Sequence, residues 1–332
     1  MNISDIAKLA GVSKSAVSRY FNDGYISDEK RERIREAVEQ TGYDPNNSGR
    51  KVRKKITSLV GVIIPKLSSE SCAKVTEGIG EVLDNEGYQL LLVNTSYNSS
   101  KEVESLDFFR NNRVDGVILL SSAITKLHMT VLKKMRVPTI VVGQNVAGFS
   151  CVCHDDEGAA YALTKLMIER GAARPAIIGV DRMDTAAGQA RYEGFSRALS
   201  ESGITHRTEY VETARFTADS GYDKANRLLS QPIPPDAVFC ATDNIAAGAM
   251  LCCLEHGLKI PDDIMITGVG DSQVGSITPV PITTAHLHYR TSGIEAAKML
   301  LEELRKKDSV RRILKLEYDI VERGSTKINH IT

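Results

Sequence analysis

Between residues 56 and 332, short apolar runs alternate with longer amphipathic segments. The apolar runs predict strands over 58–65, 88–94, 114–120, 137–143, 174–180, 236–241 and 263–269. The amphipathic segments predict helices over 70–86, 101–111, 155–170, 186–202, 217–230, 242–256 and 290–306. Near-continuous apolar strands joined by helices are typical of parallel sheets covered on both faces. The pattern therefore predicts an α/β body of two doubly wound lobes, with a ligand beyond the carboxyl ends of the strands.

The first 55 residues have a different pattern, which predicts three short helices. The first helix should bury an apolar stripe formed by Ile6, Leu9 and Ala10. Gly11 tolerates the turn that follows, and Ser13 can cap a second helix over residues 14–22. A third helix should begin after a cap at Ser27 and end at Gly42. Three such helices form the minimal core of a helix-turn-helix head.

The second of these helices carries a polar face opposite its apolar one. That face presents Lys14, Ser15, Ser18, Arg19 and Asn22. An α-helix fits the major groove of B-DNA, where an arginine can form two hydrogen bonds with one guanine. From the residues alone, a solvated helix face is the alternative interpretation, since paired helices with this turn also occur outside DNA binding.

The charge distribution favours a polyanionic partner for the head alone. The whole chain has 42 basic and 42 acidic residues, so its formal net charge is zero. Residues 1–55 hold 12 Lys+Arg and 8 Asp+Glu, a net of +4, which leaves 30 basic and 34 acidic residues, or −4, for the remainder. A basic head on an acidic body is consistent with nucleic-acid binding by the head.

The head resembles that of the LacI/GalR family of bacterial repressors. The match runs from Ser4 to Arg19, continues at Asn22 and ends with the segment 42–46, Gly-Tyr-Asp-Pro-Asn. The resemblance implies a homodimer on a near-palindromic operator in double-stranded DNA. It also implies that Lys14 and Ser15 read bases and that Arg19 stands in the place of the family's invariant arginine. Ala16 departs from the family's usual threonine, which removes an expected phosphate contact.

Residues 45–57 are predicted to form a basic hinge, because five cations lie within 50–55 and both Pro45 and Gly49 disfavour a stable helix. In the family this stretch becomes a helix on DNA and places a leucine wedge in the minor groove. The resemblance therefore adds Asn46, Arg50 and Val52 to the candidate DNA contacts. Gly49 and Val52 replace the family's alanine and leucine, so a simple basic tether remains the alternative.

Motifs that would indicate an enzyme or a metal site are incomplete. Gly268-Val269-Gly270 lacks a third glycine, and the segment 270–275 is one residue too long for a nucleophile elbow. Strand alternation explains His286-Leu287-His288 better than metal binding does, and helix capping explains the His-Asp-Asp run at 154–156. The six cysteines form no CxxC pair, as expected of free thiols. We therefore expect no enzyme activity, cofactor or metal.

The body resembles the periplasmic-binding-protein-like ligand domain of the same family, in which the chain crosses three times between two lobes. The matching segments include 61–65, 114–118, 191–195, 241–249 and 283–284. The expected organisation is a head at 1–44, a hinge at 45–57 and a ligand domain at 58–332. One lobe should comprise about 58–155 and 288–317, and the other about 156–285 and 318–332.

The resemblance also implies an effector site between the lobes. Arg191 matches the family's ligand-gripping arginine, Phe216 an aromatic side chain against the ligand, and Thr242 with Asp243 a polar pair facing the cleft. Asp243 has helix capping as an alternative role. The other candidates are Lys66, Ser69, Gln144 and Asp271.

The departures from the family bear on the identity of the ligand. Gly143-Gln144 and Gly270 stand where many members carry acidic residues. Gly143-Gln144, together with segments 65–70 and 153–156, resembles the sucrose-operon-repressor branch. Lys66 can bind a phosphorylated sugar or form an ion pair with Glu70.

The sequence as a whole predicts a cytoplasmic, homodimeric repressor of a carbohydrate operon that responds to a sugar or sugar phosphate. The first residues do not resemble a signal peptide, and no apolar stretch approaches the ~20 residues of a membrane span, so we expect no membrane partner. No heptad repeat follows residue 324, which favours a dimer over a tetramer. The alternatives are a sugar-binding protein without a DNA function and a regulator that responds to a non-sugar ligand.

Overall fold

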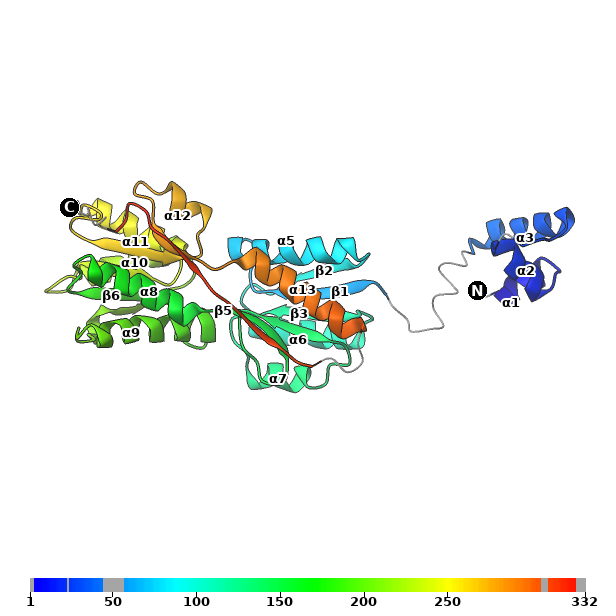
Figure 1. The fold of residues 1–332 in the computed structure, drawn as a ribbon, viewed down its shortest axis with the longest axis horizontal. Coiled ribbons are helices and arrows are strands. Elements are labelled where there is room, and N and C mark those ends of the chain that lie inside the picture. The colour runs from blue at the N-terminus through cyan, green and yellow to red at the C-terminus, as the bar shows by residue number, and fades with distance from the viewer. Residues whose placement is uncertain (1–2, 23, 44–56, 306–309, 327–332) are drawn as a thin grey trace. The chain divides into compact units, whose positions relative to one another are not determined.

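The computed structural model describes residues 3–22, 24–43, 57–305 and 310–326. Contacts within the chain divide it into two units, residues 1–57 and 58–332 (Figure 1). Each unit has its own hydrophobic core. None of the helices in the described part of the chain combines the length and the apolar character that a membrane span needs.

The N-terminal unit packs three helices around one small core. They are α1 (Ile3–Leu9), α2 (Lys14–Phe21) and α3 (Asp28–Thr41). Ile6, Val17 and Ile34 are fully buried at its centre. Ile6 and Ala10 are buried as predicted, but the prediction for Leu9 was wrong: its side chain is 55% exposed, because Ala7 takes the inward position on α1.

The ends of these helices follow from local chemistry. Gly11 and Gly42 have φ angles of +61° and +58°, a conformation that only glycine adopts without strain. The Ser13 hydroxyl accepts a hydrogen bond from the Ala16 N–H at 3.3 Å and so caps α2. Ser27 precedes α3 as predicted, but its side chain makes no capping hydrogen bond, so its capping role was overestimated.

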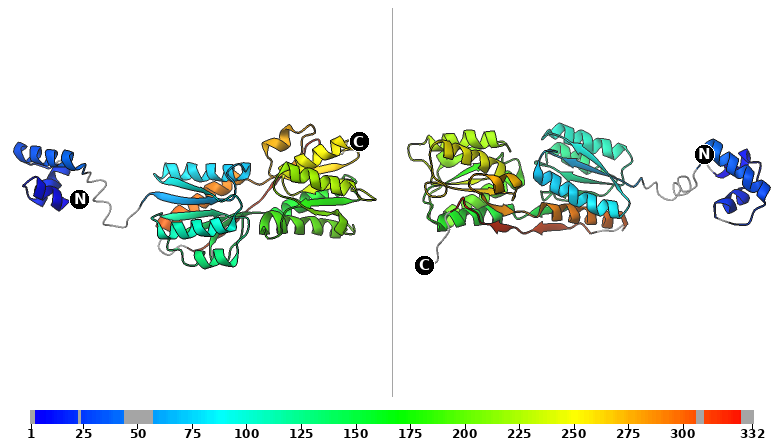
Figure 2. Two further views of the ribbon diagram at one scale, coloured as in Figure 1. Left: turned by 180° about the vertical axis from the view of Figure 1, so that it is seen from behind. Right: turned by 90° about the horizontal axis from the view of Figure 1, so that it is seen from above.

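The second unit contains two six-stranded sheets, one in each lobe (Figures 1 and 2). The first sheet is parallel throughout, in the order β11-β5-β4-β3-β1-β2. Its strands are β1 (Leu59–Ile64), β2 (Gln89–Asn94), β3 (Gly116–Leu120), β4 (Thr139–Val142), β5 (Ser150–His154) and β11 (Ile313–Leu316). The second sheet has the order β12-β10-β9-β8-β6-β7 and is parallel except for the edge strand β12. Its strands are β6 (Pro175–Gly179), β7 (Val211–Thr213), β8 (Ala237–Cys240), β9 (Met265–Val269), β10 (Thr283–His286) and β12 (Asp319–Val321).

Helices cover the faces of both sheets, as the alternating pattern predicted (Figure 2). The first lobe has α5 (Glu70–Asn85), α6 (Ser99–Asn111), α7 (Lys126–Leu132) and α13 (Tyr289–Arg305). The second has α8 (Asp156–Glu169), α9 (Arg191–Glu201), α10 (Ala218–Leu229), α11 (Asp243–Glu255) and α12 (Gln273–Ile277). The helix expected over 186–202 begins instead with a π-helical turn at Thr185–Ala190 before α9, and a 3-10 turn at Thr208–Tyr210 precedes β7.

The chain passes between the lobes three times. It leaves the first sheet after β5, returns from β10 to α13, and leaves again between β11 and β12. Figure 1 shows the last of these segments running across both lobes. The first lobe is therefore built from two distant stretches of sequence.

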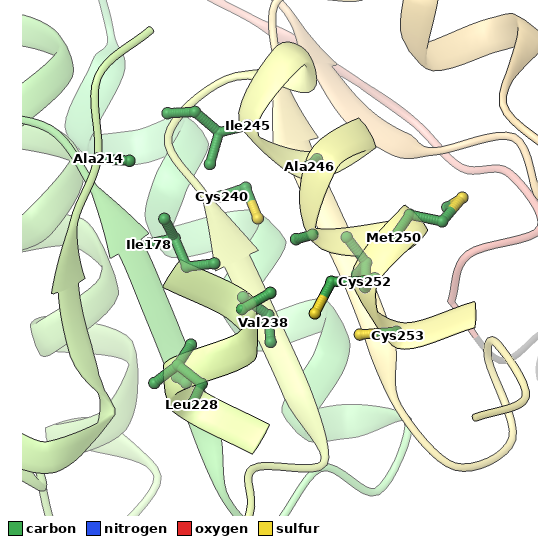
Figure 3. Close-up of a cluster of buried hydrophobic side chains, with 14 of the residues drawn as sticks. Ile178, Ala214, Leu228, Val238, Cys240, Ile245, Ala246, Met250, Cys252 and Cys253 are labelled. Atoms are coloured by element: carbon green, nitrogen blue, oxygen red, sulfur yellow. The ribbon is translucent and has the colours of Figure 1, made fainter. Parts of the chain in front are cut away.

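The second lobe has one core cluster between its sheet and helices α8 and α9, and another between its sheet and helices α10 and α11. Ile178, Val238 and Ala246 are buried in the cluster beside α10 and α11 at 0–1% exposure (Figure 3). Cys240, Cys252 and Cys253 belong to the same cluster, and all six cysteines of the chain are free thiols. Burial raises the pKa of the Cys253 thiol to about 12, so this thiol is unreactive at neutral pH.

Glycines allow neighbouring helices to approach closely in both lobes. A Cβ on Gly78 of α5 would lie 2.1 Å from the Arg290 carbonyl oxygen of α13, and one on Gly293 would lie 2.0 Å from the Val75 carbonyl oxygen. In the second lobe, a Cβ on Gly248 would meet the carbonyl oxygen of Ala218 at 1.8 Å. Only a residue without a Cβ fits at these contacts.

Candidate functional site

The polar face predicted for the second head helix is present on α2. Its members Lys14, Ser15, Ser18, Arg19 and Asn22 are all exposed, and their spacing places them on one side of the helix. Ala16 and Val17 fill the opposite side and anchor α2 to the core. The Asn22 side chain donates to the Ser18 carbonyl oxygen at 2.8 Å, which fixes the end of this face. The remaining candidate DNA contacts, Asn46, Arg50 and Val52, lie outside the described residues.

A cavity of about 210 Å³ lies between the lobes of the second unit. Residues that follow β1, β3 and β4, together with the last residue of β5, line it from the first lobe, and residues that follow β8 and β9 line it from the second. This is the carboxyl edge of both sheets, where parallel α/β folds bind ligands. The predicted residues that line it are Lys66, Ser69, Gln144, Arg191, Phe216, Thr242 and Asp243.

Arg191 is held in a buried ion pair on the wall of this cavity. Its Nε and Nη2 lie 2.8 and 2.6 Å from the Asp156 carboxylate, and its Nη1 donates to the Ala241 carbonyl oxygen. Burial alone would lower the pKa of Arg191, but the Asp156 carboxylate outweighs burial and raises it. Capping explains Asp155, which accepts from the Gly158 N–H at the start of α8, but it does not explain Asp156. Sequence reasoning missed this ion pair because 35 residues separate its members.

Asp243 is a cavity residue rather than a helix cap. Thr242 caps α11 through its side chain, whereas the Asp243 carboxylate accepts from the Ser272 N–H at 2.7 Å and the Thr284 hydroxyl at 2.6 Å. It is 1% exposed, and burial raises its pKa. Asp243 therefore ties the loop after β9 to the start of α11.

Asp271 does not line the cavity, contrary to the prediction. Its carboxylate turns away and contacts Arg323 at 2.5 Å and His286 Nδ1 at 3.0 Å. Burial would raise the pKa of Asp271, but the Arg323 guanidinium outweighs that effect and lowers it. The residue has a φ of +46°, and the turn that begins at Gly270 aims its side chain at His286, the last residue of β10, and at Arg323, which follows β12.

Lys66 and Glu70 do not form the ion pair considered from the sequence. Glu70 pairs instead with Lys74 at 2.8 Å, one turn further along α5, and also accepts from the Gln273 N–H of the second lobe at 2.9 Å. Lys74 in turn donates to the Asp271 carbonyl oxygen at 3.4 Å. These contacts connect the lobes beside the cavity and leave Lys66 without an acidic partner among the described residues.

A buried polar network supports the first-lobe wall of the cavity. Gln144 donates to the Ser121 carbonyl oxygen at 2.7 Å, and the Ser121 hydroxyl donates to Glu102 at 2.6 Å. Glu102 also lies 3.0 Å from His128 Nε2 and accepts from the Thr95 hydroxyl at 3.3 Å. All five residues are at most 7% exposed. Glu102 and His128 were not predicted, because each lies on an otherwise ordinary amphipathic helix.

Two further cavity residues come from loops. Tyr97 of the first lobe stacks on Phe216 of the second with ring centroids 5.5 Å apart and planes within 7°. Asp184 accepts hydrogen bonds from the Ala186 and Ala187 N–H groups, and burial raises its pKa to about 6. An aspartate before a short helical segment is a recognisable capping signal, whereas nothing in the sequence marks Tyr97.

His286 and His288 contact separate carboxylates and do not converge on one site. His286 faces Asp271, and His288 lies 3.2 Å from Asp319. Over the described residues, no group of three or more potential ligands could hold a metal ion.

Comparison with known proteins agrees with both halves of this description. Residues 2–46 match the family model for bacterial regulatory proteins of the lacI family, and residues 164–326 match a periplasmic binding protein-like domain. The chain is 31% identical to the sucrose operon repressor of Staphylococcus xylosus over 313 residues, which covers 94% of this chain and 97% of the relative. It is 29% identical to the HTH-type transcriptional repressor PurR of Vibrio atlanticus over 329 residues, with 98% of both chains covered.

A solved structure has the same fold as this chain. The transcriptional regulator CelR in complex with cellobiose superposes with a TM-score of 0.76 at 26% identity, covering 98% of this chain and 99% of that one. These relatives are regulators and not enzymes, as the sequence predicted. The chain belongs to the LacI family of DNA-binding bacterial transcriptional repressors.

Proposed function

We propose that this repressor controls a carbohydrate-utilisation operon and that a sugar or sugar phosphate in the cavity between its lobes sets its affinity for DNA. The observation that carries the proposal is the cavity itself, in which the buried Arg191–Asp156 pair, Gln144 and the aromatic Phe216 converge from both sheets. Polar side chains beside an aromatic ring suit a ligand that has hydroxyl groups and an apolar ring face. Lys66, which lacks an acidic partner among the described residues, favours a place for a phosphate ester in this class of ligand.

Recognition of DNA is assigned to the exposed face of α2. A homodimer would present two such faces to the two halves of a near-palindromic operator, in the cytoplasm where the DNA is. Arg19 and Lys14 are its cations, and Ser15, Ser18 and Asn22 supply uncharged hydrogen-bonding groups. Asn46, Arg50 and Val52 of the hinge complete the proposed contacts.

Control of DNA binding requires the ligand to distinguish two arrangements of the lobes. The lobes already touch beside the cavity through Glu70 with Gln273, Lys74 with Asp271, and Tyr97 with Phe216. A ligand that alters these contacts changes the relative stability of the two arrangements. A switch from 1:99 to 99:1 needs roughly 10⁴-fold preference for one of them.

A gel-shift assay tests both halves of the proposal. Operators are first selected from genomic fragments, and the complex is then challenged at moderate salt with sucrose, fructose, glucose and their phosphates. Arg19→Ala should abolish the specific shift and keep ligand binding, whereas Arg191→Ala should keep the shift and abolish its response to ligand. Arg35→Ala is the matched control, because Arg35 is an exposed head residue paired with Glu32 on α3.

The results separate the alternatives. A chain that retains no duplex under any ligand condition would be a ligand-binding protein without a DNA function. A chain that binds operator but responds to no sugar or sugar phosphate would be a regulator of another ligand class.

A further inference from the structure

One buried polar atom on the cavity wall has no partner. His154, the last residue of β5, lines the cavity and is 9% exposed, and its Nε2 makes no hydrogen bond within the protein. Buried polar groups in folded proteins are nearly always paired, because an unpaired one loses its hydration without compensation. A nitrogen left free at the edge of a cavity therefore points to a partner that enters the cavity.

The ring is held in this position by contacts that do not involve its Nε2. The His154 backbone lies at the end of β5, in register with Leu316 of β11. Its ring packs edge-on against Tyr289 with centroids 5.2 Å apart and planes at 73°. The next two residues are also fixed, Asp155 by capping α8 and Asp156 by the Arg191 ion pair. The position of the ring is thus set before any ligand arrives, which is the condition for a selective contact.

The charge state of the ring decides what it can recognise. Burial lowers the pKa of His154 to about 4; the nearby Asp156 opposes this shift, and Arg191 and His288 add to it. At neutral pH the imidazole is therefore uncharged, with one nitrogen that donates and one that accepts. A hydroxyl group can pair with either nitrogen, because it both donates and accepts.

We propose that His154 Nε2 forms a hydrogen bond with a hydroxyl group of the bound ligand and that His154 is a specificity-determining residue of the cavity. His154 belongs to the first lobe, and Arg191 and Asp156 of the second lobe line the same cavity. Neighbouring hydroxyl groups of one ligand would therefore contact both lobes. The inference rests on the proposed function, since it takes the cavity to be the effector site.

Calorimetric titration of the full chain with sucrose, fructose, glucose and their phosphates tests the proposal. For the probe that binds, His154→Leu should weaken binding about 5- to 100-fold, because the ligand hydroxyl then faces an apolar group. His154→Gln, which keeps a donor and an acceptor, should lose less. His206→Leu is the matched control, because His206 bonds Tyr192 in the second lobe and does not line the cavity.

Deoxy analogues of the bound sugar provide a readout that a purely structural role would not affect. For the wild type, one monodeoxy analogue should bind more weakly than the parent sugar. For His154→Leu, that analogue and the parent sugar should bind with equal affinity, so the effects of removing the hydroxyl and of removing the imidazole are not additive. If His154→Leu melts early, the same comparison is made with His154→Gln, for which the loss on removing that hydroxyl should be smaller than in the wild type.

Equal affinity of the wild type and both His154 variants for the bound sugar, with Arg191→Ala still abolishing binding, would overturn the inference and leave the proposed function standing. Additive losses for every deoxy analogue would also overturn it. If no member of the panel binds the wild-type chain, the proposed function fails and the inference falls with it.

Discussion

The close approach of α5 and α13 predicts opposite effects for alanine at two glycines of the same helix. Gly78 is buried against α13, and a Cβ there would lie 2.1 Å from the Arg290 carbonyl oxygen. Gly80 lies two residues further along α5, and a Cβ added there would have no neighbouring atom within 4 Å. The two substitutions change the same helix by the same methyl group and differ only in what that group meets.

The magnitudes follow from this geometry. Ordinary van der Waals contact begins at 3.4 Å, so the backbones at Gly78 must separate by about 1.3 Å. Overpacking of a core costs about 1–3 kcal/mol, and the upper part of that range applies here because a backbone carbonyl cannot rotate aside. Replacing a glycine inside a helix by alanine stabilises the folded protein by about 0.5–1 kcal/mol, because the unfolded chain loses conformational freedom. We expect Gly78→Ala to destabilise the protein by about 2 kcal/mol and Gly80→Ala to stabilise it by about 0.5–1 kcal/mol.

Urea denaturation followed by circular dichroism measures both variants against the wild type. The melting temperature provides a second measurement, in which Gly78→Ala should fall by about 4–8 °C. The ligand cavity need not be occupied for either experiment. If the two variants have free energies of unfolding within 0.5 kcal/mol of each other, the helix contact at Gly78 does not have the tightness described, and the reasoning is refuted.

Two further predictions concern buried carboxylates. The pKa of Asp184 rises from 3.8 to about 6 in the folded protein, so its contribution to stability is complete below pH 4 and is lost as the pH rises through 6, by at most about 3 kcal/mol. Urea midpoints from pH 4 to 7 should show this decline in the wild type and less of it in Asp184→Asn; parallel profiles would contradict it. Glu102→Leu leaves the Ser121 hydroxyl and the His128 ring without their buried partner and should destabilise by about 3 kcal/mol. The exposed Glu104→Leu on the same helix should change stability by less than about 0.5 kcal/mol in the same assay, and equal effects of the two would refute this role for Glu102.

The apolar patterning of the sequence predicted the strands at the centre of each sheet. Strands such as β1 and β3 are buried on both faces, so their residues form continuous apolar runs that sequence inspection recognises. β5 was missed because its burial includes Ser150 and His154, which hide the pattern. β11 and β12 were missed because they are short edge strands with alternating exposure, which pair with residues more than 30 positions away.

The candidate site could be predicted through the family resemblance, which supplied Arg191, Phe216 and the Thr242–Asp243 pair, and through position along a strand. Lys66 was placed at the cavity because it follows the first strand, at the carboxyl edge of a parallel sheet, and Gln144 because it stands where family members carry a ligand-binding pair. Side-chain direction was not predictable in the same way. The turn with positive φ at Asp271 sends its carboxylate to Arg323, and neither the turn nor that partner is visible in the local sequence.

The three passages of the chain between the lobes have a consequence for synthesis on the ribosome. The core of the first lobe needs Ala296, Ala297 and Leu300 of α13, which are translated only after almost all of the second lobe. Until then one apolar face of the nascent first-lobe sheet, which includes Val62 and Ile118, is covered by α5 but lacks α13. A gene fragment that stops after β5 therefore encodes an incomplete core, and an independent first lobe must be made by splicing residues 58–155 directly to the segment that contains α13 and β11.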